Sequence, residues 1–244
     1  MAGLAFTYEG YNELVRTLEV SGYRFTDYQD YGQYPRCVIL RHDIDNSIGK
    51  AVKLAELEAE LGVRSTYFVL MTSDFYNPAS KNSQEGLQHI HQLGHGIGLH
   101  FDEMAYSHLE DVPSAIQREA RILTDIIGLP ITTVSMHRPS PMTLEADYSI
   151  PGIINSYGKV FFKDFKYLSD SRRRWREPVL DIIRSGQYDR LHILTHAIWY
   201  NEVEENIHDS IKKFVCLANW ERYCQEKENI KDIESILDIS EIIR

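Results

Sequence analysis

The chain has 244 residues, with 26 lysines and arginines against 36 aspartates and glutamates, and a formal net charge of −10. This length can form a substantial α/β core, and the acidic balance argues against a nucleic-acid backbone as the main partner. No window approaches the roughly 18 apolar residues of a membrane span.

Apolar periodicity predicts strands that alternate with helices. Strands are expected at 37–42, 65–70, 95–101, 131–137 and 190–195, with two or three short ones within 150–170. Helices are expected at 9–22, 47–61, 84–93, 112–127 and 178–185. This order favours a single domain over 1–244 with a mostly parallel α/β sheet or barrel, followed by a charged, helical tail from about residue 201.

The cysteines and the N-terminus indicate a cytoplasmic protein. Cys37, Cys216 and Cys224 are odd in number and scattered, which is typical of reduced thiols. The first residues lack the basic start and the apolar stretch of a secretory signal peptide. The pattern gives no oligomeric state.

A pair of acids closes the first strong strand, in the segment 41–45, Arg-His-Asp-Ile-Asp. Side chains alternate along a strand, so Asp43 and Asp45 point to the same side. Two carboxylates held close together repel each other, which indicates a cation beside them. The structural alternative is that Asp45, Asn46 or Ser47 caps the following helix.

Histidines end three other predicted strands. His100 follows two glycines on its face of the strand, Gly96 and Gly98, which would leave room for an ion or ligand. His137 precedes Arg138 and a proline, and we expect Arg138 to pair with Asp43 or with a substrate oxygen. His196 ends the last strand, a position suited to donating a proton. Active sites of such barrels lie at the carboxyl ends of the strands.

A loop near 167–176 combines polar residues, an arginine run and a tryptophan. Asp170 and Trp175 are typical of a sugar-binding loop, as is Trp199 beyond the last strand, because aromatic rings stack on apolar sugar faces. The arginines at 172–174 either lie in a solvated loop or bind a phosphate or carboxylate group.

Together these motifs resemble the NodB-type polysaccharide deacetylases, most closely the cytoplasmic WbmS-like branch. The resemblance covers about residues 8–200 and implies a distorted seven-stranded (β/α) barrel with one divalent metal at its mouth. By this resemblance Asp43 is the catalytic base, Asp45 and His100 bind the metal, Arg138 matches the family arginine, and His196 is the acid.

Two positions depart from the family pattern. Ile44 separates acids that are usually adjacent, and Met104 stands where a second histidine is expected. We therefore predict His137 as the third ligand from its strand-end position, with Asp102 and His108 as alternatives.

The sequence thus predicts a metal-dependent hydrolase that removes an N-acyl group, with acetyl favoured, from a nucleotide- or lipid-linked amino sugar in surface-glycan biosynthesis, including lipopolysaccharide. Zinc is the expected cofactor, and Mn, Fe, Co or Ni would accept the same ligands. Two alternatives remain: hydrolysis of a formamide or ureido C–N bond, and a catalytically silent sugar-binding barrel.

Overall fold

The computed structural model describes residues 3–108 and 111–242. Internal contacts divide the chain into two compact units, Met1–Glu202 and Val203–Arg244. The first unit carries the whole sheet and every predicted site residue. Among the helices of the described residues, no stretch combines the length and the apolar composition that crossing a bilayer requires.

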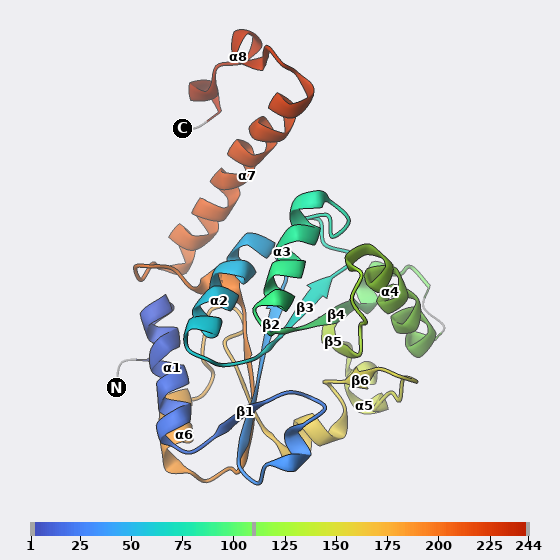
Figure 1. Ribbon diagram of the computed structural model, residues 1–244, viewed down its shortest axis with the longest axis vertical. Helices are drawn as coiled ribbons and strands as arrows, with labels where there is room; N and C mark the ends of the chain where they lie inside the picture. Colours follow the sequence, from blue (N-terminus) through green and yellow to red (C-terminus); the bar gives the residue numbers. More distant parts are fainter. Residues whose placement is uncertain (1–2, 109–110, 243–244) are drawn as a thin grey trace. The chain divides into compact units, whose positions relative to one another are not determined.

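The first unit is built around one sheet whose paired strands all run parallel (Figure 1). Seven strands follow the order β6-β5-β4-β3-β2-β8-β7, and the short β1 pairs with β2. The strands are β1 (Arg24–Thr26), β2 (Cys37–Ile44), β3 (Thr66–Leu70), β4 (Gly96–Asp102), β5 (Thr133–His137), β6 (Ile154–Asn155), β7 (Lys166–Ser169) and β8 (Arg190–Thr195). The predicted distorted seven-stranded (β/α) barrel is confirmed, and its sheet forms a half-barrel in which β6 and β7 are the end strands among the described residues.

Helices connect the strands and cover the outer face of the sheet (Figure 1). They are α1 (Tyr8–Val20), α2 (Ile48–Glu60), α3 (Lys81–Gln92), α4 (Val112–Ile127), α5 (Pro141–Ala146) and α6 (Val179–Ser185). Ser47 caps α2 by accepting a hydrogen bond from the amide of Lys50, and Gly128 ends α4 in the left-handed region at φ 72°. Of the three residues predicted as possible caps, Ser47 caps the helix, and Asp45 does not.

Aromatic side chains fill the inner face of the sheet. Tyr28, Phe68 and Phe161 pack edge to face there, with ring centroids 5.9 and 5.0 Å from Tyr28. Gly98 makes room for this cluster, because a Cβ at that position would lie 2.5 Å from the Phe68 ring. The space expected for an ion beneath His100 is thus occupied by Phe68, and a ligand must approach from the mouth.

The second unit consists of α7 (Ile207–Asn229) and the short α8 (Ile233–Ile236). Tyr223 of α7 is buried and donates a hydrogen bond to the carbonyl of Leu237. This contact folds the segment after α7 back onto the helix. The tail is helical, as the sequence predicts.

A buried polar network joins β2 to α1, α2 and β3. Glu58 of α2 is fully buried and accepts hydrogen bonds from Tyr11 (2.5 Å), Ser65 (2.6 Å) and Tyr67 (2.8 Å). His42 Nε2 lies 3.0 Å from the same carboxylate. Burial raises the pKa of Glu58, but the charge and hydrogen bonds of His42 and its other partners outweigh burial and lower it to about 2.

We predict that Glu58→Gln lowers the free energy of unfolding at pH 7 by roughly 3 kcal/mol, the equivalent of the pKa shift from 4.5 to about 2. Because the folded-state pKa is depressed, this contribution is present above about pH 4.5 and is lost as the pH falls towards 2. Urea unfolding at several pH values measures the difference between the two proteins.

The matched control is Glu60→Gln, an exposed acid on the same helix, which should leave the unfolding free energy unchanged. A wild-type advantage over Glu58→Gln that stays constant between pH 7 and pH 3 would refute the assignment of Glu58 as a buried carboxylate.

Candidate active site

Three predicted ligands converge at the mouth of the barrel. Asp45 Oδ1 lies 3.2 Å from His100 Nε2 and 3.4 Å from His137 Nδ1, and the two ring nitrogens are 3.1 Å apart. One ligand atom from each residue lies within 4.8 Å of the others, a group able to hold a metal ion. Asp102 and His108, the alternatives to His137, do not belong to this group within the described residues.

The parallel register explains the convergence. β4 pairs with β5 so that His100 lies opposite Ser135 and Asp102 lies opposite His137. Asp45 directly follows the end of β2, two strands away from β4 in the sheet. Because parallel strands end at the same edge, all three side chains reach one point of the mouth.

The hydrogen bonds of His100 suit a metal ligand. Its Nδ1 lies 2.6 Å from Ser135 Oγ, and that hydroxyl donates to Asp43 Oδ1 at 3.5 Å. With the proton on Nδ1, the lone pair of Nε2 faces Asp45. Asp45 Oδ1 is buried and has no hydrogen-bond partner within the described residues. A carboxylate and two imidazoles are the ligand types that zinc and similar divalent ions accept.

Asp43 lies next to this group, held by a buried cation. Arg41 Nη2 donates to Asp43 Oδ2 at 2.7 Å, and Arg41 also donates to Ser156 Oγ at 3.1 Å. Burial raises the pKa of Asp43, but the charges of Arg41 and the nearby histidines outweigh burial and hold it below its ordinary value. Asp43 is therefore a carboxylate whose two oxygens face Arg41 and Ser135.

Of the two partners expected for Arg138, Asp43 is wrong, and contact with a substrate oxygen stays a prediction. Arg138 forms an ion pair with Asp102, and its side chain is 65% exposed. Its backbone lies in the left-handed region, with φ 49°, directly after the end of β5. Arg41, and not Arg138, forms the ion pair with Asp43.

His196 lies on the opposite side of Asp45. Its Nε2 is 3.8 Å from Asp45 Oδ2, and its Nδ1 is 2.6 Å from Asp170 Oδ1. Burial lowers the pKa of His196, but the charge and hydrogen bond of Asp170 outweigh burial and raise it to about 9. The charge of Asp170 thus favours the protonated form of the ring.

The predicted contact between Asp170 and a substrate is wrong, because the Asp170 side chain is buried. Asp170 is fully buried behind His196, where it accepts hydrogen bonds from the His196 amide at 3.1 Å and from Tyr200 at 3.4 Å. Trp175 and Trp199 are partly buried on the segments after β7 and β8, near the mouth.

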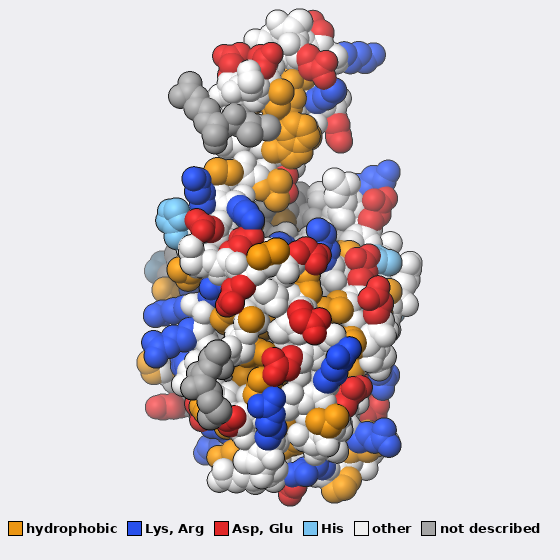
Figure 2. Space-filling model, turned by 90° about the vertical axis from the view of Figure 1, so that its left-hand side faces the viewer, with side chains coloured by type: hydrophobic (Ala, Val, Ile, Leu, Met, Phe, Trp, Pro, Cys, Tyr) orange, Lys and Arg blue, Asp and Glu red, His pale blue; other side chains and the backbone are white. Residues whose placement is uncertain are grey.

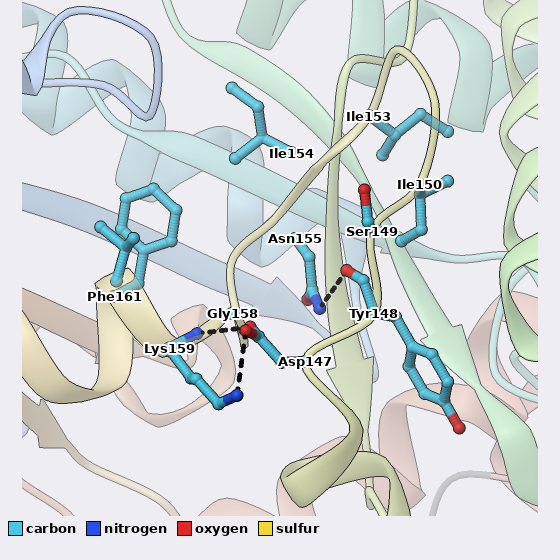
Figure 3. A pocket seen from close by; sticks show the side chains of 11 residues that line it. Asp147, Tyr148, Ser149, Ile150, Ile153, Ile154, Asn155, Gly158, Lys159 and Phe161 are labelled. Atoms are coloured by element: carbon cyan, nitrogen blue, oxygen red, sulfur yellow. Dashed lines mark hydrogen bonds and ion pairs between the residues drawn. The ribbon is translucent and has the colours of Figure 1, made fainter.

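A separate pocket of about 320 Å³ lies beside β6, outside this group (Figure 3). It is lined by the segment 147–161, and Figure 3 shows Asp147 bound to Lys159 and Asn155 bound to the Tyr148 carbonyl. No predicted site residue lines it, so this pocket has no part in the arrangement at the mouth.

Two residues of the site have no predicted role, although both lie in segments that the sequence singles out. Arg41 stands two residues before Asp43 and therefore on the same face of β2. Ser135 stands two residues before His137 on β5. Strand periodicity could have placed Arg41 beside Asp43, whereas the position of Ser135 beside His100 depends on the register between β4 and β5.

A scan of known protein families found no match to the chain, and a search of curated proteins found no significant match. Solved structures similar to it are family 4 carbohydrate esterases and polysaccharide deacetylases. A Streptococcus mutans CE4 esterase is 16% identical over 86% of this chain and 91% of that chain, with a TM-score of 0.49.

Two others illustrate the range of these similar structures. A family 4 acetyl xylan esterase from Clostridium thermocellum, in complex with a cobalt ion, is 12% identical over 75% of this chain and 84% of that one, with a TM-score of 0.44. BA3943, a CE4 family pseudoenzyme from Bacillus anthracis, is 13% identical over 74% of this chain and 63% of that one, with a TM-score of 0.42. Similarity at this level of identity establishes neither a substrate nor a mechanism for this chain.

The geometry predicts an effect of Ser135 on metal affinity. Ser135→Ala removes the partner of His100 Nδ1 and should weaken zinc binding roughly 10–100-fold, because partners of a ligating imidazole fix its tautomer and orientation. His137→Ala should weaken binding further. Titration calorimetry with zinc measures both, with His208→Ala, an exposed histidine, as the control. Unchanged zinc affinity in His137→Ala would contradict the proposed ligand set.

Proposed function

We propose that the protein is a metal-dependent hydrolase that removes an N-acyl group from an amino sugar. The observation that supports this function is the meeting of three potential ligands, Asp45, His100 and His137, next to the carboxylate of Asp43 and the ring of His196. Hydrolysis of an amide needs a group that accepts a proton from water and a group that donates one to the departing amine.

Asp45, His100 and His137 would hold the metal. Three protein ligands leave positions open for water and for a substrate oxygen, as catalytic zinc sites require. When bound, a divalent ion lowers the pKa of water and polarises a carbonyl. Zinc is our proposed ion, and Mn, Fe, Co or Ni suits the same donors.

Asp43 is the proposed base. Arg41 holds one of its oxygens at 2.7 Å and keeps the side chain charged and oriented towards the mouth. Its Oδ2 is 3.6 Å from His100 Nε2, so it lies beside the ligand group without belonging to it. From there it can accept a proton from water as the oxygen adds to the acyl carbon.

His196 is the proposed acid. Asp170 orients the ring through Nδ1 and leaves Nε2 directed towards Asp45. The protonated Nε2 can transfer its proton to the nitrogen as the C–N bond breaks, which releases a carboxylic acid and a free amine. Asp170 is a positioning residue in this scheme, since it acts through His196.

The amino-sugar substrate is proposed from the sequence resemblance and from the two tryptophans near the mouth. Trp175 and Trp199 lie on the segments after β7 and β8, where a ring could stack on a sugar face. We further propose that the reaction belongs to surface-glycan biosynthesis and takes place in the cytoplasm.

The test is acid release from a panel of N-acetylated amino sugars, with N-formylated sugars and ureido compounds beside them. Purified zinc-loaded protein should release acetate from at least one sugar. Release of formate or ammonia in place of acetate would indicate that the protein hydrolyses a formamide or ureido C–N bond. Ligand binding without any hydrolysis by the metal-loaded protein would indicate a silent sugar-binding barrel.

His196→Ala should lower kcat roughly 10²–10⁴-fold, the usual effect of removing an acid or base, while zinc content and folding stay unchanged. Asp170→Asn should lower kcat less and should shift the alkaline limb of the pH profile to lower pH, because it removes the charge that raises the pKa of His196. Near-full activity of His196→Ala would exclude His196 as the acid.

A further inference from the structure

A side-chain hydroxyl joins the last residues of β2 and β3 below the surface of the barrel, where Figure 2 shows acidic and basic side chains interspersed. Ile44 ends β2 and Leu70 ends β3, and Ile44 lies opposite Val69 in the register. The Tyr76 hydroxyl accepts a hydrogen bond from the Leu70 amide at 2.9 Å and donates one to the Ile44 carbonyl at 2.6 Å. Ile44 and Leu70 are buried, so water cannot readily replace this hydroxyl.

Ser73, on the same segment, contacts the main chain of Asp45. Its hydroxyl donates to the Asp45 carbonyl at 3.3 Å and accepts from the Phe75 amide at 3.1 Å. The Ser73 amide donates to the Leu70 carbonyl at 3.3 Å. The segment 71–76 therefore returns from the end of β3 to two successive carbonyls at the end of β2.

These two carbonyls belong to the peptide groups on either side of the Asp45 Cα. Because each peptide group is planar, hydrogen bonds to both of them restrict φ and ψ of Asp45 and set the direction of its side chain. Asp45 Oδ1 is buried and has no hydrogen-bond partner within the described residues. The like charge of Asp43, two residues earlier, repels the Asp45 carboxylate. The direction of this side chain thus depends on its main chain.

The Tyr76 phenol is protonated at neutral pH, as donation to Ile44 requires. Burial raises the pKa of Tyr76, the hydrogen bond from the Leu70 amide lowers it, and the charges of Asp45 and Asp43 raise it again. The net shift is upward from an ordinary value of 10. The same charges show that the hydroxyl lies close to both acids of the site.

We propose that Tyr76, assisted by Ser73, is a positioning residue that directs the Asp45 carboxylate towards His100 and His137. Without the phenol hydroxyl the end of β2 gains freedom, and Asp45 Oδ1 is no longer held 3.2 Å from His100 Nε2. The inference rests on the metal site of the proposed function, and it assumes nothing about the acyl group or the sugar.

The test is zinc binding by full-length Tyr76→Phe, measured by titration calorimetry. This substitution removes the hydroxyl and keeps the ring. The dissociation constant for zinc should rise roughly 10-fold, at the lower end of the effect of groups that support a metal ligand, because Tyr76 holds the main chain and not the carboxylate. Ser73→Ala should raise the constant by less, since its hydrogen bond to Asp45 is longer.

Two matched variants remove the same groups away from the mouth. Tyr23→Phe removes a buried hydroxyl that donates to the Tyr188 carbonyl. Ser185→Ala removes a hydroxyl that donates to the Ile182 carbonyl and accepts from the Gln187 amide. Tyr23 precedes β1 and Ser185 precedes β8, so both lie before the amino ends of strands, whereas the proposed ligands lie at the carboxyl ends. Both variants should bind zinc like the wild type.

Stability separates a positioning role from a structural one. Urea unfolding of the zinc-free proteins should show a loss in both Tyr76→Phe and Tyr23→Phe, because each loses a buried hydrogen bond. Only Tyr76→Phe should lose zinc affinity. Hydrogen exchange of the Leu70 amide should be faster in zinc-free Tyr76→Phe than in the zinc-free wild type.

Unchanged zinc affinity in Tyr76→Phe, or an equal loss in Tyr23→Phe, would overturn the positioning role and leave the metal centre in place. If Tyr76→Phe does not fold, Ser73→Ala decides, with Ser185→Ala as its control, and equal zinc affinity in these two variants would overturn the role. A wild type that binds no zinc would instead refute the proposed function, and the inference with it.

Discussion

The buried ion pair between Arg41 and Asp43 is the interaction on which the candidate site depends. Both side chains lie inside the barrel, Arg41 fully buried and Asp43 nearly so, with 2.7 Å between them. A buried carboxylate without a partner would take up a proton or destabilise the fold, and breaking such a pair costs roughly 3–5 kcal/mol. With Arg41 in place, Asp43 stays charged beside Asp45. Two acids can then share the mouth without both acting as ligands.

Strand β2 carries buried polar side chains on both faces. Towards the barrel interior it presents Arg41 and Asp43, and towards the helices it presents His42, which lies 3.0 Å from Glu58. Each of these side chains has a partner within hydrogen-bonding distance, so the strand remains compatible with burial on both faces. Because Thr195 Oγ1 also lies 2.6 Å from His42 Nδ1, the network outside the sheet joins β2 to the strand that precedes His196. This hydrogen bond thus connects β2, which precedes Asp45, to β8, which precedes His196.

The strand pattern and the positions of the main site residues could be predicted from the sequence, because apolar runs that end in Asp or His are local features. The ion-pair partners and the choice of the third metal ligand could not be predicted from the sequence. Arg41 stands two residues from Asp43 in the sequence, whereas Arg138 has no acid nearby and pairs with Asp102 on the neighbouring strand β4. His137 and Asp102 both end strands, and the register between β4 and β5 separates their roles. Glu58 lies on a helix with ordinary amphipathic spacing, so nothing local indicates its buried network.

The central claim is that Asp45, His100 and His137 form one metal centre at the mouth of the barrel. X-ray absorption spectroscopy of the zinc-loaded protein tests it most directly. The account predicts a first shell of nitrogen and oxygen at about 2.0–2.1 Å, with the outer scattering of two imidazoles. One of these imidazoles should be missing in His137→Ala. A shell containing sulfur, or a spectrum that is identical in wild type and His137→Ala, would contradict the claim.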